Sequence, residues 1–271
     1  MNIIVFDTET TSLDKPFCYN VGYVIYDTEQ GAVLTSKEYV VEQIWHNLPL
    51  FSTAYYANKR KFYVKEMRAR RIKLEKFGYI CQSMIRDIKN YQVVSAYAYN
   101  SSFDEKVFSF NCDWFKCNNP FDNIPIFDIR GFVHNSIIGK DYKRFCDNHG
   151  YYTESGNYST TAETVYRFIT QNTDFVENHT ALDDALIETD ILLLCIRCGL
   201  DLLTNYKSKR TIPRVIEKTL TIDNKGEKIK IKCNGYTFYR TKDLIKIKWK
   251  KNRATALFFW RNLTSKTDGA P

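Results

Sequence analysis

The 271-residue sequence contains no apolar run long enough to cross a membrane. Its most apolar stretch, Ile191 to Ile196, is far shorter than the roughly 20 residues of a spanning helix. A secretory signal is also missing, because Asp7 and Glu9 interrupt the apolar segment that begins at Ile3. No polymerase or helicase motif is present. We therefore expect a cytoplasmic protein without membrane contact, which would need partners for any role in replication.

Paired cysteine motifs, which would indicate zinc ribbons or redox centres, are equally scarce. Cys195 and Cys198 have C-x-x-C spacing, but no second pair follows at ribbon spacing, so we interpret them as core packing. Cys112 and Cys117 are likewise not assigned to a metal. We expect all eight cysteines to be reduced thiols. Three of the four histidines show no ligand spacing: His46, His134 and His149.

What the sequence does contain is acidic residues at the ends of apolar segments. The run Ile3–Phe6 is typical of a buried strand, and Asp7 and Glu9 follow it directly. Side chains two residues apart on a strand share a face, so these two carboxylates would lie together. Their mutual repulsion raises one pKa, and a hard cation that binds oxygen relieves it. The pair therefore indicates a metal site.

A second stretch ends the apolar segment Val93–Tyr99, which is rich in strand formers. Asn100 and the two serines after it are good helix caps, so a helix is expected to begin near residue 101. Asp104 would then lie in the first turn of that helix.

The third stretch precedes Ala185–Leu194, whose apolar spacing predicts a long and mostly buried helix. Asp184 would lie near the start of this helix, and His179 in the loop before it. Histidine titrates near neutrality, which suits it to proton transfer.

The three stretches, in this order, resemble the Exo I, Exo II and Exo III motifs of the DEDDh exonucleases, the DnaQ-like branch of the ribonuclease H-like superfamily. The matching positions are Asp7 and Glu9 for D-x-E, Asn100 and Asp104 for N-x-x-x-D, and His179 and Asp184 for H-x-x-x-x-D. By this register Asp184, rather than Asp183, is the metal ligand, and Asp183 is a capping or solvent-facing neighbour. The motifs span roughly residues 1–200.

The chain departs from the family in one place after the first motif. Where the family often has T-G-L, this sequence has Thr11-Ser12-Leu13, which replaces the glycine and keeps the leucine. From the resemblance we predict three substrate-binding residues: Thr10, Leu13 and Asn100.

The resemblance also implies a role for each motif residue in a reaction with two Mg²⁺ or Mn²⁺ ions. Asp7 would bridge both ions, while Glu9 and Asp184 would complete the shell of the first. Asp104 would hold the second ion, and His179 would accept the proton of the attacking water. Metal ligands are thus predicted at all four acidic positions.

The order of expected elements agrees with a mixed α/β sheet flanked by helices, the ribonuclease H-like fold. Strands are predicted at 2–7, 19–27, 32–41, 93–99 and near 126–129, with Gly31 in a hairpin turn. One or two helices are predicted over 55–90, another from 101, and more across 140–200. We assign residues 1–204 to this exonuclease domain.

Charge is distributed unevenly along the chain. Residues 205–271 hold 18 Lys and Arg against 5 Asp and Glu, and residues 55–90 hold 11 against 3, whereas the remainder is acidic. We predict that 205–271 is a small, basic, β-rich appendage with a linker near 207–213 and a hairpin around 224–226. Alternating lysines also protect sheet edges, and an acidic protein partner would fit as well, but nucleic-acid contact is favoured.

These inferences predict a metal-dependent 3′-to-5′ exonuclease that releases nucleoside monophosphates, with DNA favoured and single-stranded 3′ ends as the expected substrate. The polarity and the product follow from the resemblance. Two alternatives stay open: a 3′-end-trimming exoribonuclease of the same family, and a nucleic-acid-binding or polymerase-associated subunit. Contacts to the 2′ position distinguish RNA from DNA, and no motif marks them here.

Overall fold

The computed structural model describes residues 1–209, 211–213, 219–222, 229–233, 236–241 and 244–247. The chain divides into two compact units. The large unit contains Met1–Tyr151 and Ser159–Ile212, and the small unit contains Tyr152–Tyr158 and the chain from Pro213 onward. None of the helices in the described ranges is both long and apolar enough to cross a lipid bilayer.

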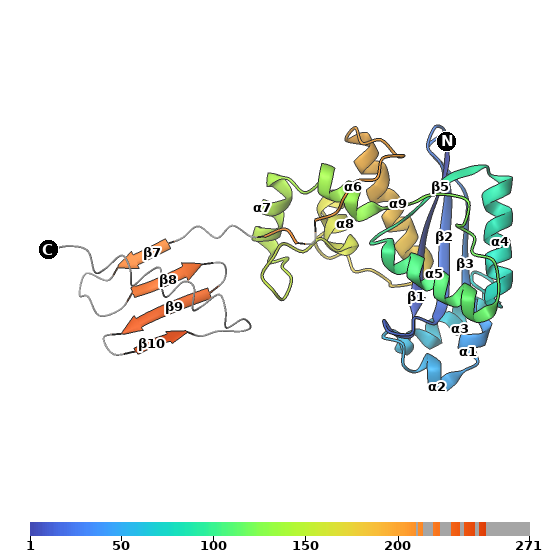
Figure 1. The fold of residues 1–271 in the computed structure, drawn as a ribbon, viewed down its shortest axis with the longest axis horizontal. Coiled ribbons are helices and arrows are strands. Elements are labelled where there is room, and N and C mark those ends of the chain that lie inside the picture. Colours follow the sequence, from blue (N-terminus) through green and yellow to red (C-terminus); the bar gives the residue numbers. More distant parts are fainter. Residues whose placement is uncertain (210, 214–218, 223–228, 234–235, 242–243, 248–271) are drawn as a thin grey trace. The chain divides into compact units, whose positions relative to one another are not determined.

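A six-stranded mixed sheet forms the centre of the large unit (Figure 1). Its strands are β1 (Asn2–Thr10), β2 (Cys18–Asp27), β3 (Ala32–Val41), β4 (Lys73–Glu75), β5 (Val93–Ala98) and β6 (Ile126–Asp128), in the order β4-β3-β2-β1-β5-β6. The first three pair antiparallel, while β5 and β6 continue the sheet in parallel and β4 pairs in parallel with β3. This is the mixed α/β sheet that the sequence predicts.

Helices cover both faces of this sheet, and Figure 1 shows α9 and α4 on opposite sides of it. The helices are α1 (Glu42–Trp45), α2 (Leu48–Phe51), η1 (Ala57–Lys59), α3 (Arg60–Arg68), α4 (Phe77–Asn90), α5 (Ser102–Phe115), α6 (Ile129–Ser136), α7 (Lys140–His149), α8 (Ala162–Thr170) and α9 (Ala181–Arg197). On β1, Ile4 and Phe6 join the core beneath α4 and α5, where Phe6 packs edge-on against Phe108. Alternate positions point to the other face, toward α9.

The segment 55–90 corrects the sequence-based expectation. The short helix η1 and the helix α3 form there, but the strand β4 separates them from α4. Helix α3 ends at Arg68 with Ala69 as its C-cap, and Arg70 then adopts a left-handed backbone with φ 60°. The chain then pairs with the edge of the sheet, with Leu74 opposite Val40. The local sequence is rich in helix formers, so only this distant pairing with β3 makes the segment a strand.

The small unit contains a second, antiparallel sheet in the order β10-β9-β8-β7. Its strands are β7 (Thr219–Ile222), β8 (Ile229–Cys233), β9 (Tyr236–Thr241) and β10 (Leu244–Ile247). The predicted hairpin strands are therefore present as β7 and β8, while the predicted turn at 224–226 lies outside the described residues.

Residues that follow α9 pack against the large unit. A Cβ atom at Gly131 would lie 1.9 Å from the Tyr206 carbonyl oxygen, so the chain passes directly over this glycine. The Lys209 backbone N–H donates to His134 Nδ1 at 2.6 Å. The large unit accordingly continues to Ile212, and the division at residue 204 stays a prediction.

Candidate active site

Three carboxylates meet between β1 and α9. Oxygen atoms of Asp7, Glu9 and Asp184 all lie within 4.8 Å of one another, and we call these residues the carboxylate cluster. Asp7 and Glu9 share a face because they are two residues apart on β1, which runs to Thr10 and so includes both. Asp184 lies in the first turn of α9.

The neighbouring strand β2 determines where α9 begins. Gly22 lies opposite Asp7 in the strand register, and a Cβ atom there would lie 2.1 Å from the Leu182 backbone nitrogen. Only glycine leaves room for this close approach. Opposite Glu9, the buried Asn20 accepts a hydrogen bond from the Ala181 N–H at 2.8 Å. These two positions therefore hold the start of α9 against the carboxylates of β1.

Asp104 reaches the same region from the other side of β1. It is buried in the first turn of α5, and Thr8 Oγ1 donates to its carboxylate at 2.6 Å. The predicted serine caps do not form a side-chain bond to the helix backbone; instead the Ser101 hydroxyl donates to Glu105. Asp104 also raises the pKa of Asp7 through charge repulsion, which shows that the two are electrostatically close.

Burial and repulsion disturb the titration of every carboxylate here. Desolvation is the largest cause, and it raises the pKa of Glu9 to about 8 and those of Asp104 and Asp184 to about 7. Desolvation, reinforced by the neighbouring charges, also holds the pKa of Asp7 well above its usual value. Four neighbouring carboxyl groups with raised pKa values destabilise the folded protein when they ionise. Such groups are typical of a functional site.

The donor set fits a divalent cation. Among the described residues, Asp184 Oδ1 is buried without a hydrogen-bond partner, so this atom has an unused lone pair inside the cluster. Carboxylate oxygens are the ligands that Mg²⁺ and Mn²⁺ prefer, and a cation would lower all of the raised pKa values together. Asp183 instead accepts hydrogen bonds from the Thr180 hydroxyl at 3.0 Å and from the Asn178 side-chain amide at 3.1 Å.

His179 lies in the loop before α9, in a left-handed backbone with φ 47°. Its ring stacks on Tyr56, with centroids 4.5 Å apart and planes 14° from parallel. Its Nδ1 atom lies 3.6 Å from Glu177 Oε2, and Lys59 Nζ donates to its carbonyl oxygen at 3.2 Å. Desolvation and the Lys59 charge lower its pKa, so the ring is held neutral and able to accept a proton.

Four of these neighbours are not identified individually from the sequence: Tyr56, Lys59, Glu177 and Glu188. Lys59 and Tyr56 belong to the basic, aromatic segment at 55–90, but their contacts with His179 depend on the fold. Glu188 is buried one turn after Asp184, accepts from the Tyr99 N–H at 3.1 Å, and raises the pKa of Asp7. Glu188 could have been recognised from the sequence as a charged residue among the apolar, buried positions of the predicted helix.

The predicted substrate-binding residues lie apart from these interactions. Asn100 is exposed with φ 62°, a backbone that asparagine tolerates better than most residues, and its N–H donates to Asp128. Thr10 Oγ1 donates to the Ser12 carbonyl at 3.3 Å. Leu13 exposes 76% of its surface. Their roles toward a substrate stay predictions.

Comparison with solved structures places the fold among exonucleases. A full-length 3′-exonuclease matches with a TM-score of 0.51 and 13% identity, covering 91% of this chain and 93% of the other. The nuclease domain of 3′hExo, a DEDDh family member bound to rAMP, matches at 0.48 and 14% identity over 75% of this chain and 96% of that domain. A scan of protein-family profiles finds no match, and neither does a search of curated proteins.

The likeness to the 3′-exonuclease extends over nearly the whole of both chains, and at 13% identity it concerns the fold. The six-stranded mixed sheet with helices on both faces is the arrangement that they share. The chain therefore shares the overall fold of this 3′-exonuclease, which agrees with the mixed α/β fold expected from the sequence.

Proposed function

We propose that this protein is a divalent-metal-dependent 3′-to-5′ exonuclease that releases nucleoside monophosphates and favours DNA. One observation carries the proposal: three carboxylates from two distant segments meet within 4.8 Å, in a fold that a 3′-exonuclease shares. Structural packing gives no reason to bury these like charges together. Metal-assisted hydrolysis of a phosphodiester does.

In this mechanism Asp7, Glu9 and Asp184 would hold the first cation, and Asp104 would help to hold the second. Bound Mg²⁺ or Mn²⁺ would activate water and stabilise the negative charge that develops on the phosphate. His179 accepts the proton of the attacking water. The stacked Tyr56 ring fixes the plane of the imidazole, while Glu177 stands beside Nδ1 and favours the tautomer that leaves the other ring nitrogen free as the base.

Cations must hold a polyanionic substrate against an acidic centre. Lys59 is positioned for this task. Its positive charge lies close enough to Glu9 and Asp184 to oppose part of the rise in their pKa values. Several neighbouring cations are exposed on and after α3, namely Lys61, Lys65, Arg68, Arg70 and Arg71. The basic residues of 205–271 would extend this binding, with single-stranded 3′ ends as the preferred substrate.

The decisive experiment incubates the purified chain with labelled single-stranded DNA, duplex DNA and RNA, each with Mg²⁺, Mn²⁺ or a chelator. We expect mononucleotide release from the labelled 3′ end, abolished by the chelator and fastest on single-stranded DNA. Asp184→Asn should inactivate the enzyme, and the adjacent Asp183→Asn is the matched control that should retain activity. Activity that persists in the chelator would contradict the metal-dependent mechanism.

Two other functions make different predictions in the same assay. Faster trimming of RNA than of DNA would identify an exoribonuclease instead. Tight, salt-dependent binding with no cleavage by the wild type would favour a nucleic-acid-binding or polymerase-associated subunit. The separate small unit is the feature that keeps a polymerase or repair partner under consideration. We propose the cytoplasm as its location, since no described cysteine forms a disulfide.

A further inference from the structure

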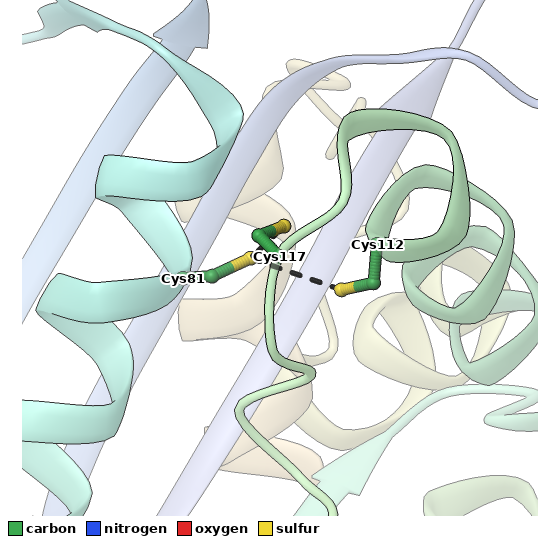
Figure 2. Close-up of side chains that lie close together, drawn as sticks. All are labelled: Cys81, Cys112 and Cys117. Carbon is green, nitrogen blue, oxygen red and sulfur yellow. Dashed lines mark hydrogen bonds between the residues drawn. The ribbon is translucent and has the colours of Figure 1, made fainter.

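Cys81 of α4 meets Cys112 and Cys117, which lie in and just after α5 (Figure 2). Cys81 Sγ lies 4.0 Å from Cys112 Sγ and 3.9 Å from Cys117 Sγ, and all three sulfur atoms are within 4.8 Å of one another. We call them the thiol cluster. Cys81 and Cys112 are buried, and Cys117 is partly exposed.

The end of α5 brings Cys112 and Cys117 to the same side. Lys116 adopts a left-handed backbone with φ 55°, which stops the helix and turns the chain back. The Cys117 N–H then donates to the Cys112 carbonyl oxygen at 3.1 Å. On the other helix, a Cβ atom at Gly78 would be 3.6 Å from Cys117 Cβ, so Cys117 packs closely on α4 one turn before Cys81.

The spacing of the sulfur atoms agrees with that of a tetrahedral zinc site. Zn–S bonds of about 2.3 Å at tetrahedral angles separate neighbouring sulfurs by about 3.8 Å. The two measured distances of 3.9 and 4.0 Å are close to this value. A disulfide needs about 2.05 Å, so either pair would have to close by roughly half its separation.

We propose that Cys81, Cys112 and Cys117 bind one Zn²⁺ ion as thiolates. Each thiol that binds gives its proton to solvent, so the metal–sulfur bonds form without any change in oxidation state. Because three protein ligands leave one tetrahedral position open, water or a small ligand would complete the shell beside the partly exposed Cys117.

This site would be chemically separate from the carboxylate cluster. Soft thiolates select zinc, whereas carboxylates select Mg²⁺ and Mn²⁺. Cys112 lies eight residues after Asp104 on the same helix, which corresponds to about 12 Å along its axis. The ion would join the end of α5 to α4 and leave the reaction to the other site.

Cobalt titration distinguishes the two sites, because Co²⁺ gives an intense sulfur-to-metal charge-transfer absorption only when thiolates bind it. The reduced full-length chain, freed of metal, is titrated with Co²⁺ and then with Zn²⁺. We expect this absorption to saturate at one Co²⁺ per chain and to disappear as Zn²⁺ displaces the cobalt. Cys112→Ser and Cys117→Ser should each lose most of it, while Cys146→Ser, a buried cysteine outside the cluster, should retain it.

Thiol alkylation of the wild-type chain provides a test that does not depend on the folding of any variant. With Zn²⁺ present, mass spectrometry of proteolytic fragments should show slower labelling at Cys81, Cys112 and Cys117, and unchanged labelling at the exposed Cys198. The proposal is overturned by absence of the charge-transfer absorption, by its retention in both cluster variants, or by a disulfide within the cluster that forms while the reduced chain binds no zinc.

Discussion

The carboxylate cluster and the thiol cluster are both groups of side chains of metal-binding types assembled from distant segments, but burial has different consequences for them near neutral pH. The carboxylates are ionised in water, so burial opposes their charge and raises their pKa values. Thiols are neutral below their ordinary pKa, and three of them can be buried as small apolar groups. The metal-free carboxylate cluster is therefore under electrostatic strain, whereas the metal-free thiol cluster is not.

This difference explains why the carboxylate cluster requires a bound cation or protons, whereas the thiol cluster can bind an ion but does not require one. The carboxylate cluster needs either protons or a cation to be stable near neutral pH. The thiol cluster is stable empty and binds zinc only if the ion is available. Changes at the two clusters should accordingly have different consequences for activity, for pH dependence and for stability.

The largest contrast is expected in catalysis. Asp7→Ala should lower kcat on the order of 10⁴-fold or more, because Asp7 would be a ligand of the cation on which the reaction depends. Cys81→Ala should leave kcat near the wild-type value, provided that circular dichroism shows it is folded. Single-turnover rates on single-stranded DNA with Mg²⁺ measure both. Near-normal turnover of Asp7→Ala would exclude the two-metal site.

His179 tests the proton chemistry beside the carboxylates. His179→Ala should lose about 10²–10⁴-fold in kcat, with little change in Mg²⁺ affinity, because the base contributes to proton transfer rather than to metal binding. The wild-type rate should fall as pH drops below the pKa of His179. If the alanine variant instead turns over normally and keeps the same pH profile, the ring only packs against Tyr56.

Gly22 tests whether the position of α9 assembles the cluster. A methyl group there would overlap the backbone at Leu182, so Gly22→Ala should shift the start of the helix and lower kcat by about 10²-fold. Gly139→Ala is the matched control, since its Cβ would meet only an atom 3.9 Å away and its φ is −105°. Equal activity of the two variants would show that the site tolerates movement of α9.

The pH dependence of stability sharpens the contrast further. In the folded, metal-free protein the pKa of Glu9 rises from 4.5 to about 8, and that of Asp184 from 3.8 to about 7. Between these limits the folded state therefore binds more protons than the unfolded state. Stability is then greatest below about pH 4 for these groups and is lost as pH rises toward 8, at about 1.4 kcal/mol for each unit of raised pKa.

Thermal melts in chelator should therefore show Tm falling from about pH 5 to about pH 8, and Mg²⁺ should reverse most of the fall. Cys112→Ser should follow the same slope as the wild type, since it leaves the carboxylate cluster unchanged. A Tm that rises with pH over this range would contradict the burial of the cluster.

The smallest effect concerns the basic C-terminal segment. Because the large unit continues to Ile212, truncation after that residue removes the small unit's sheet and leaves the segment that contacts Gly131 and His134. The shortened chain should bind nucleic acid with a shallower dependence of log K on log [salt], and kcat on short oligonucleotides should change little. Equal salt dependence in the full-length and shortened chains would indicate that the basic segment contacts an acidic protein partner instead of nucleic acid.

The sequence was sufficient where a local pattern determines structure. The apolar run before Asp7 and the long buried stripe after Asp184 predicted β1 and α9 because each signal lies within a few residues. The three motifs then named five acidic and histidine positions, and the fold brings three of the carboxylates into one cluster.

The remaining contacts join residues far apart in the chain, where local patterns carry no information. The Lys59 bond to the His179 carbonyl spans 120 residues, and the thiol contact between Cys81 and Cys112 spans 31. Strand β4 exists through its pairing with β3, so its own three residues could not reveal it. The thiol cluster is likewise not visible in the sequence, since Cys81 belongs to another helix than Cys112.

The pairing of β1 with β2 has a consequence for how insertions would act on this protein. Asp7 faces Gly22 and Glu9 faces Asn20 in the ladder, which continues without a break up to Glu9. Shifting one strand by a single residue turns every side chain of that strand to the opposite face. A one-residue insertion early in β1 would keep its apolar character and its hydrogen bonds, yet it would present Thr8 to α9 and bury Asp7 under α5. Selection on catalysis should therefore tolerate length changes in the β2–β3 turn around Gly31 and forbid them within β1.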